Sequence, residues 1–253
     1  MKLATWNVNS LNVRLPQVLD WLAQTSTDIL LLQEIKMLDN QFPTENFTQA
    51  GYHAQCFGQK TYNGVAIISR YPITDVAYNI PGFEDEQARV ITATIEGIRT
   101  VCAYIPNGQA PGTDKFDYKM TWLQALNTWL AQETEKHPQL ILAGDYNIAP
   151  EDRDVYDPIA WKGQILCTPQ ERQHFQNLLG LGLSDAFRLF EQEPGLWSWW
   201  DYRNLSFQKN KGLRIDHILV SHPLKEQVKT CFIDKAPRKN ERPSDHAPVV
   251  IEL

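Results

Sequence analysis

Hydrophobic residues along this chain are gathered into short runs separated by polar turns. Several runs alternate apolar and polar positions, and many are rich in the β-branched residues that suit a pleated strand. Nine such runs predict strands, over residues 2–9, 28–34, 64–70, 89–97, 98–106, 139–147, 213–221, 228–235 and 247–253. Glu96-Gly97, between the fourth and fifth runs, predicts a tight hairpin turn.

Three other stretches have helical patterning. Residues 15–23 predict a helix with Pro16 in its first turn, where the missing N–H of proline is tolerated. Residues 117–135 place apolar side chains on one helical face, at Met120, Leu123, Leu126 and Leu130. A third helix is expected to begin at Thr168, because a proline follows it and a glutamate stands three positions on, as in a capping box.

The order of these elements predicts the fold class. The chain has no internal repeat and no linker long enough to separate two domains. Many strands with helices distributed between them predict two β-sheets packed face to face, with helices covering their outer surfaces. Residues 1–253 are therefore expected to form a single α/β sandwich domain. No heptad seam or self-pairing edge is visible, so a monomer is expected.

Composition is that of a globular protein with a large core, since 43% of the residues are hydrophobic and eight are tryptophan. No stretch approaches the roughly 20 apolar residues of a membrane span, and no apolar block follows the N-terminus. The four cysteines form no CxxC or zinc spacing and three lie in apolar runs, which predicts reduced thiols in a cytoplasmic protein. The net charge of −6 decides nothing about nucleic-acid binding, because local patches and bound cations control it.

Polar residues recur at the edges of the apolar runs. We refer to them as the strand-edge set: Asn7, Asn9, Glu34, Asp145, Asn147, Asp216, Asp245 and His246. Taken one at a time, most have an ordinary explanation as turn formers or solvated strand ends. Asp216 is the exception, because an acid inside an apolar strand requires a hydrogen-bonding partner.

The chemistry of this set points to a hard cation and a phosphate ester. Oxygen donors of the Asn, Asp and Glu types suit Mg²⁺, with Mn²⁺ as a substitute, and the absence of a Cys/His cluster disfavours zinc. An acid-rich site with one imidazole suits phosphate-ester hydrolysis, in which the metal neutralises oxygen charge and a base produces the attacking hydroxide.

At this point the sequence resembles the exonuclease III-type abasic-site endonucleases, of the endonuclease/exonuclease/phosphatase superfamily. The matching segments occur in family order along the whole chain: WNVNSLNVR, LLQEIK, QKTYNGVAI, AYIPNG, LAGDYNIAP, TPQER, SWWDYR, GLRIDHILVS and PSDHAP. The resemblance implies a DNase I-like four-layer α/β sandwich. It also implies a Mg²⁺-dependent DNA repair nuclease with 3′→5′ exonuclease, 3′-phosphodiesterase and abasic-site endonuclease activities on double-stranded DNA. Leu213 stands where some members have Trp, in agreement with the bacterial exodeoxyribonuclease III pattern.

The resemblance implies a metal site within the strand-edge set. Glu34 would be the main ligand, with Asn7 and Asp245 close to the metal. The residues implied to contact the metal are Asn7, Glu34, Asp145, Asn147, Asp245 and His246. The number of metal ions stays open.

The resemblance also implies catalytic roles. Asp145 would activate or orient the attacking water, and Asn147 would hold that water and the phosphate. His246 would contact the scissile phosphate, with Asp216 fixing the tautomer of its ring. Tyr104 would place its phenol on the phosphate or near the metal; the alternative is a buried strand tyrosine. Whether Asp145 or His246 is the general base stays open.

Cations near these motifs are together candidates for binding DNA phosphates, whereas the ordinary interpretation of any one of them alone is a solvated surface charge. The expected DNA contacts are Asn9, Lys36, Lys60, Arg89, Lys115, Lys119, Trp199, Arg203, Leu213 and Arg214. Trp199 resembles a family aromatic that packs against a displaced sugar, whereas Trp200 is expected to face the other way; core packing is the alternative for either. Bulky Leu166 or Cys167 is expected to narrow the DNA channel and to shift preference between internal abasic sites and strand ends.

Two other functions remain as alternatives. One is a superfamily phosphatase acting on a phosphoester other than DNA, although such members generally lack TPQER, SWWDYR and GLRID in this arrangement. The other is a DNA-binding protein that has lost catalysis, which would be expected to have replaced Glu34, Asp145, Asn147 or His246. Assay of cleavage with and without EDTA separates an enzyme from such a relic.

Overall fold

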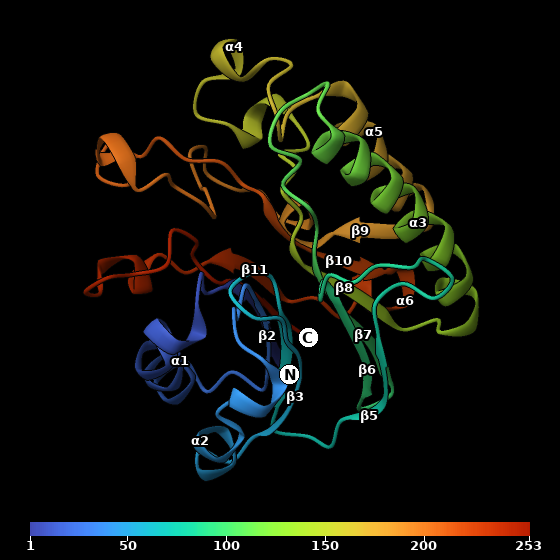
Figure 1. The fold of residues 1–253 in the computed structure, drawn as a ribbon, viewed down its shortest axis with the longest axis vertical. Coiled ribbons are helices and arrows are strands. Elements are labelled where there is room, and N and C mark those ends of the chain that lie inside the picture. Colours follow the sequence, from blue (N-terminus) through green and yellow to red (C-terminus); the bar gives the residue numbers. More distant parts are fainter.

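The computed structural model describes residues 1–253 as two β-sheets that face each other, with helices on their outer sides (Figure 1). The first sheet has the order β11-β12-β1-β2-β4-β3 and the second β5-β6-β7-β8-β10-β9. α1 and α2 cover the outside of the first sheet, and α3 and α5 cover the outside of the second (Figure 1). The four-layer α/β sandwich is therefore confirmed.

The strands of the first sheet are β1 (Lys2–Asn7), β2 (Ile29–Gln33), β3 (His53–Phe57), β4 (Val65–Ser69), β11 (Thr230–Ile233) and β12 (Val249–Glu252). Those of the second are β5 (Thr74–Tyr78), β6 (Val90–Ile95), β7 (Ile98–Tyr104), β8 (Leu140–Asp145), β9 (Leu183–Asp185) and β10 (Asp216–Ser221). The α-helices are α1 (Leu11–Thr25), α2 (Thr44–Gln49), α3 (Asp114–Lys136), α4 (Pro158–Trp161), α5 (Pro169–Gly180) and α6 (His222–Lys225). Short 3₁₀ turns lie at Asp39–Gln41, Asp152–Asp154, Ala186–Leu189, Arg203–Leu205 and Ala236–Lys239.

The two sheets repeat one pairing pattern. In each, one central pair of strands is parallel, β1 with β2 and β7 with β8, and every other neighbouring pair is antiparallel. A parallel pair requires a crossover connection, and α1 and α3 supply it. Within each parallel pair the carboxyl ends of the two strands lie side by side, and side chains can gather there into a site.

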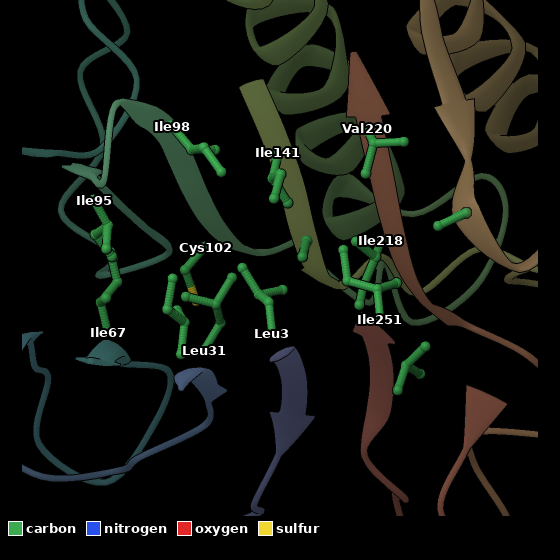
Figure 2. Close-up of a cluster of buried hydrophobic side chains, with 14 of the residues drawn as sticks. Leu3, Leu31, Ile67, Ile95, Ile98, Cys102, Ile141, Ile218, Val220 and Ile251 are labelled. Carbon is green, nitrogen blue, oxygen red and sulfur yellow. The ribbon is translucent and has the colours of Figure 1, made fainter. Parts of the chain in front are cut away.

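The core between the sheets is apolar and closed to solvent. Leu3, Leu31 and Ile251 from the first sheet face Ile141 and Ile218 from the second (Figure 2). Separate clusters fill the space beneath α1 and α2 and beneath α3 and α5. The central strands are thus covered on both sides, which explains why runs such as residues 29–32 are continuously apolar instead of alternating.

All nine predicted strands form, and the predicted hairpin turn is present, with Glu96 and Gly97 at φ 49° and 77°. The sequence reading missed β3, β5 and β9. β3 and β5 have mostly exposed or half-buried residues, and β9 is only three residues long. All three lie at sheet edges, where the apolar signal of a strand is weakest.

The predicted helices form with corrected boundaries. α1 begins at Leu11, so Pro16 lies inside the helix and its placement in the first turn was wrong. The cause is tertiary: Leu11 is buried, and its N–H donates to Ile35 O at 3.2 Å, which anchors the helix start. α3 begins three residues before the expected position, after an N-cap at Thr113, and α5 begins with the predicted capping box at Thr168. No helix combines the length and apolar character needed to cross a membrane.

Candidate active site

Strand ends bring the strand-edge set together. Asn7 is the last residue of β1, Glu34 follows β2 directly, and Asp145 is the last residue of β8. Asp145 pairs in register with Tyr104 at the end of β7 and with Asp216 at the start of antiparallel β10. Residues far apart in sequence therefore meet at one end of the sandwich.

Asn7 links the two sheets at this end. Its amide nitrogen donates to Glu34 Oε1 and to Asp145 Oδ2, both at 2.9 Å. The Tyr104 hydroxyl donates to Glu34 Oε1 at 3.0 Å, and the Lys36 ammonium lies 2.8 Å from Glu34 Oε2. Glu34 is consequently held by an amide, a phenol and an ammonium.

Several residues here adopt a backbone conformation that L-residues rarely occupy. Glu34, Lys36, Asn9 and Asn147 have φ values of 53°, 54°, 44° and 49°. Left-handed non-glycine residues cost of order 1–3 kcal/mol each and persist only where their surroundings hold them. At Glu34 the carbonyl accepts from the Ser10 N–H at 2.8 Å, which secures the turn that aims its carboxylate at Asp145.

A buried carboxylate orients the imidazole. His246 Nδ1 lies 2.9 Å from Asp216 Oδ2, and its Nε2 lies 3.8 Å from Asp145 Oδ2. Asp216 itself is held by Ser198, whose hydroxyl accepts from the Asp216 N–H at 3.0 Å. Because the carboxylate accepts a hydrogen bond from Nδ1–H, Nε2 is directed at Asp145 and the cavity.

The ionisation of this group follows from burial and charge. Burial raises the pKa of Asp145 to about 7, with His246 opposing and Asp216 adding to the rise. Burial would lower the pKa of His246, but Asp216 and then Asp145 outweigh it and raise the pKa to about 10. Burial raises the pKa of Tyr104 well above 10, and Glu34 and Asp145 raise it further, so its phenol stays protonated.

The donor set fits a divalent cation. Glu34, Asp145 and His246 each offer a ligand atom, and these atoms lie within 4.8 Å of one another. Two observations disagree about His246: its position suits a ligand, whereas its raised pKa favours an imidazolium that donates to an anion. We favour the imidazolium, because carboxylates stand at both ring nitrogens, Asp216 at 2.9 Å from Nδ1 and Asp145 at 3.8 Å from Nε2. The carboxylate oxygens of Glu34 and Asp145 are then the donors that suit a cation.

Asp245 and Asn147 lie beside Glu34, Asp145 and His246, and the side chains of both are held by hydrogen bonds. Asp245 accepts from Asn9 Nδ2 and from Trp199 Nε1, both at 2.9 Å. Burial opposes ionisation of Asp245, but His246 and these hydrogen bonds prevail and lower its pKa. Asn147 Nδ2 donates to Ile105 O at 3.0 Å, so one of its amide protons remains for a ligand.

A cavity of about 310 Å³ opens over these groups. Its polar wall includes Glu34, Asp145 and His246. The apolar part of the lining, which we call the apolar wall, comprises Trp161, Ile165, Leu166, Trp199 and Ile215. A larger cleft of about 750 Å³ shares Tyr104 and Asn107 with it and carries Arg89 and Lys115. The cavity and the cleft together therefore present carboxylates, an apolar wall and, at one side, the cations Arg89 and Lys115.

The expected DNA contacts fall into two groups. Seven of them lie on the surface near the site or line its two cavities: Asn9, Lys36, Lys60, Arg89, Lys115, Trp199 and Arg203. Trp199 is half-buried in the cavity wall, whereas Trp200 is fully buried against Phe207, as the alternation of strand residues predicts. Leu166 lines the cavity, but Cys167 does not.

The prediction was wrong for the remaining three expected DNA contacts, because their side chains are buried and cannot reach DNA. Lys119 and Leu213 are 0% exposed and Arg214 is 1% exposed. Arg214 is paired with Asp154 and Asp185 inside the protein, and Lys119 is paired with Glu171. Proximity to a motif in the sequence was misleading, since it does not show on which face of an element a side chain lies.

The sequence reading missed Asn107, which lines both cavities and donates from Nδ2 to Asn147 Oδ1 at 3.1 Å. Its position just after the run at residues 98–106 is the same signal that identified the strand-edge set. Trp161 and Ile165 of the apolar wall were also missed, and no pattern in the sequence marks them.

Comparison with known proteins places this geometry among nucleases. Residues 4–246 match the Endonuclease/Exonuclease/phosphatase family. The chain is 36% identical to exodeoxyribonuclease III of Haemophilus influenzae, over 100% of both chains. It superposes with a TM-score of 0.98 and 49% identity on a 3′ phosphatase (NExo) from Neisseria bound to a product DNA hairpin, covering 100% and 99% of the two chains. An AP endonuclease from Archaeoglobus fulgidus gives a TM-score of 0.96 at 34% identity, with the same coverage.

Proposed function

The chain belongs to the endonuclease/exonuclease/phosphatase family, and on that premise we propose that it is a DNA repair nuclease of the exodeoxyribonuclease III type. It hydrolyses phosphodiester bonds in double-stranded DNA at 3′ ends and abasic sites. The observation that carries the proposal is the convergence of Glu34, Asp145 and His246 at one cavity, with Asp216 behind the imidazole. Full-length similarity to exodeoxyribonuclease III and to an AP endonuclease supports the choice of DNA as substrate.

Glu34 and Asp145 would hold Mg²⁺, or Mn²⁺ as a substitute, with Asn7, Asn147 and Asp245 around it. When bound, the cation supplies neutralisation of charge on the phosphate oxygens. Asn7 keeps the two carboxylates together through its amide hydrogen bonds, at a separation that suits a shared ion. Carboxylate oxygens are the ligands that such a hard cation prefers.

Asp145 is proposed as the general base. Its carboxylate faces the cavity and is held there by hydrogen bonds from Asn7 Nδ2 and from the Asn147 N–H, both at 2.9 Å, which positions it to take a proton from water. His246, held as an imidazolium by Asp216, donates from Nε2 to a phosphate oxygen. The free amide proton of Asn147 is a further donor for the phosphate, whereas Tyr104 donates its one phenol proton to Glu34 and holds that carboxylate in place.

The shape of the cavity supports 3′-end processing as the main task. Leu166 is almost fully buried with φ 72° and lines this cavity, and we place the entry of an extrahelical sugar beside it. A bulky residue at this point restricts an internal abasic sugar more than it restricts a strand end. The similarity to a Neisseria protein described as a 3′ phosphatase and a 3′–5′ exonuclease supports the same preference.

The test uses three labelled duplexes, which carry an internal abasic analogue, a blocked 3′ end or a recessed normal 3′ end. We expect cleavage with Mg²⁺, none with EDTA, and losses of about 10³-fold or more in Asp145→Asn and His246→Ala. His222→Ala, at an exposed histidine outside the site, is the matched control and should keep wild-type rates. Leu166→Gly should raise cleavage at the abasic analogue relative to the 3′ ends.

The alternatives make different predictions in the same assay. Tight binding of all three duplexes without cleavage under any metal would indicate a DNA-binding relic. Metal-dependent hydrolysis of small phosphoesters without cleavage of DNA would indicate a phosphatase with another substrate.

The four cysteines are free thiols, which fits the reducing, cytoplasmic compartment that we propose for this protein. We also propose that the protein is a monomer.

A further inference from the structure

The loop after β8 carries Asn147, and its backbone forms no regular helix or strand hydrogen bonds. Residues 146–150 lie outside helix and strand, and Asn147 has φ 49°. Three successive carbonyls of this loop instead accept from side chains of three other elements. The donors to residues 147, 148 and 149 are Lys119 Nζ at 2.7 Å, His217 Nε2 at 2.8 Å and Arg172 Nε at 3.1 Å.

Lys119 is the most committed of these donors. Its side chain is fully buried, and its ammonium donates to Asn147 O, to Asn107 O at 3.2 Å and to Glu171 Oε1. An ammonium has three protons, so each has one acceptor. A buried charge of this kind is costly unless it is paired, so the contacts hold the ammonium in one position. Gly108 allows the close approach, since a Cβ there would lie 2.9 Å from Lys119 Cδ.

Glu171 extends the connection to the apolar wall of the cavity. Its Oε1 accepts from the Leu166 N–H at 3.0 Å, and its Oε2 accepts from the Thr168 N–H at 3.0 Å and hydroxyl at 2.7 Å. Glu171 is also fully buried. One ion pair therefore joins the backbone at Asn147 and Asn107 to the backbone at Leu166, beside the direct bond from the Ala149 N–H to Leu166 O at 2.8 Å.

We propose that Lys119 is a positioning residue, which with Glu171 sets the distance between the Asn147 side of the active-site cavity and its Leu166 side. The inference rests on the proposed function for its effect on catalysis. Lys119 does not touch substrate, because it has no exposed surface. It acts through Asn147 and Leu166, whose placement decides whether the scissile phosphate meets Asp145 in a reactive geometry.

The test removes both charges at once, in Lys119→Met with Glu171→Gln, so that no unpaired charge is left buried. The matched control is Arg99→Met with Glu133→Gln. That ion pair is also largely buried, with side chains 10% and 9% exposed, and it joins β7 to α3. It lies about 21 Å further along α3, away from the cavity. Both double variants are assayed well below their unfolding temperatures.

We expect kcat on the recessed 3′ end to fall about 10–100-fold in the Lys119 double variant, with KM within about three-fold of wild type. Amide hydrogen exchange should accelerate at residues 146–149 and at Leu166, without a matching change on β7. The control should lose thermal stability and keep kcat. Equal kcat in the two double variants, or unchanged exchange at these loops, would overturn the proposal.

The two readouts separate this inference from the proposed function. If the wild-type protein does not cleave DNA, the proposed nuclease function fails, and the exchange measurement alone decides whether Lys119 holds the two walls. If the wild-type protein cleaves and the Lys119 double variant cleaves equally fast, only the positioning role fails.

Discussion

Two buried histidines show how a few neighbouring atoms decide the charge of a side chain. Carboxylates raise the pKa of His246 to about 10 against the effect of burial. Burial and, second to it, the Arg214 guanidinium lower the pKa of His217 to about 4. Arg214 Nη1 donates to His217 Nδ1 at 3.0 Å, so the His217 proton is on Nε2 and is donated to Ile148 O. Asp216 and His217 are adjacent, yet strand alternation turns one to the site and the other to the α5 side.

His217 therefore predicts a loss of stability in mild acid. Its folded-state pKa lies below the unfolded value of 6.5, so the unfolded state binds the proton first as pH falls. Its contribution is present above pH 6.5 and is lost progressively down to pH 4, by about 3 kcal/mol. His217→Gln keeps a donor for Ile148 O but does not titrate. Urea unfolding between pH 4 and 7 should show a smaller acid loss in the variant; parallel curves for both proteins would contradict this.

At the scale of elements, α3 and α5 both begin at a capping threonine, but the two caps differ in how deeply they are buried. α5 starts with a buried capping box, in which Thr168 accepts from the Glu171 N–H at 3.2 Å and donates to its carboxylate. α3 starts with a simpler cap, in which Thr113 accepts from the Phe116 N–H at 3.3 Å. The sequence identified the first cap because the spacing of Thr and Glu is a local signal.

The two caps predict unequal costs. Thr113→Ala should lower the free energy of unfolding by about 1 kcal/mol, the usual value for an N-cap threonine. Thr168→Ala should cost about 2 kcal/mol, because it also removes one of the two donors to the buried Glu171 Oε2. Denaturant unfolding of both variants measures the difference. Equal losses would show that the carboxylate contributes nothing beyond an ordinary cap.

At the scale of the whole molecule, the space between the sheets holds the fold together and fixes the site. Glu34 belongs to the first sheet and Asp145 to the second, so their separation depends on how the two sheets pack. The cluster between the sheets, which includes Leu31 and Ile141, is almost entirely closed to solvent (Figure 2). Close packing of this kind leaves little freedom for one sheet to slide over the other.

Leu31→Ala should lower the free energy of unfolding by about 3 kcal/mol, through lost burial and a cavity in the inter-sheet core. Leu205→Ala, at a leucine that is 61% exposed, should cost about 0.5 kcal/mol or less. If residues 1–253 form the single domain we propose, tryptophan fluorescence and far-UV circular dichroism will report one coincident transition for both variants. Separate transitions would indicate that the sheets unfold independently and would contradict that proposal.

The sequence by itself determined the strands with strong apolar runs, the Glu96-Gly97 turn, the cap at Thr168 and the residue types of the site. These features are local, since patterning, turn chemistry and oxygen ligands can be read over a few positions. Only the tertiary structure decided that Pro16 lies within a helix, that the edge strands β3, β5 and β9 form, and that Lys119 and Arg214 are buried instead of facing DNA. Each of these depends on contacts between segments distant in the chain, and the periodicity of one segment carries no information about its partner.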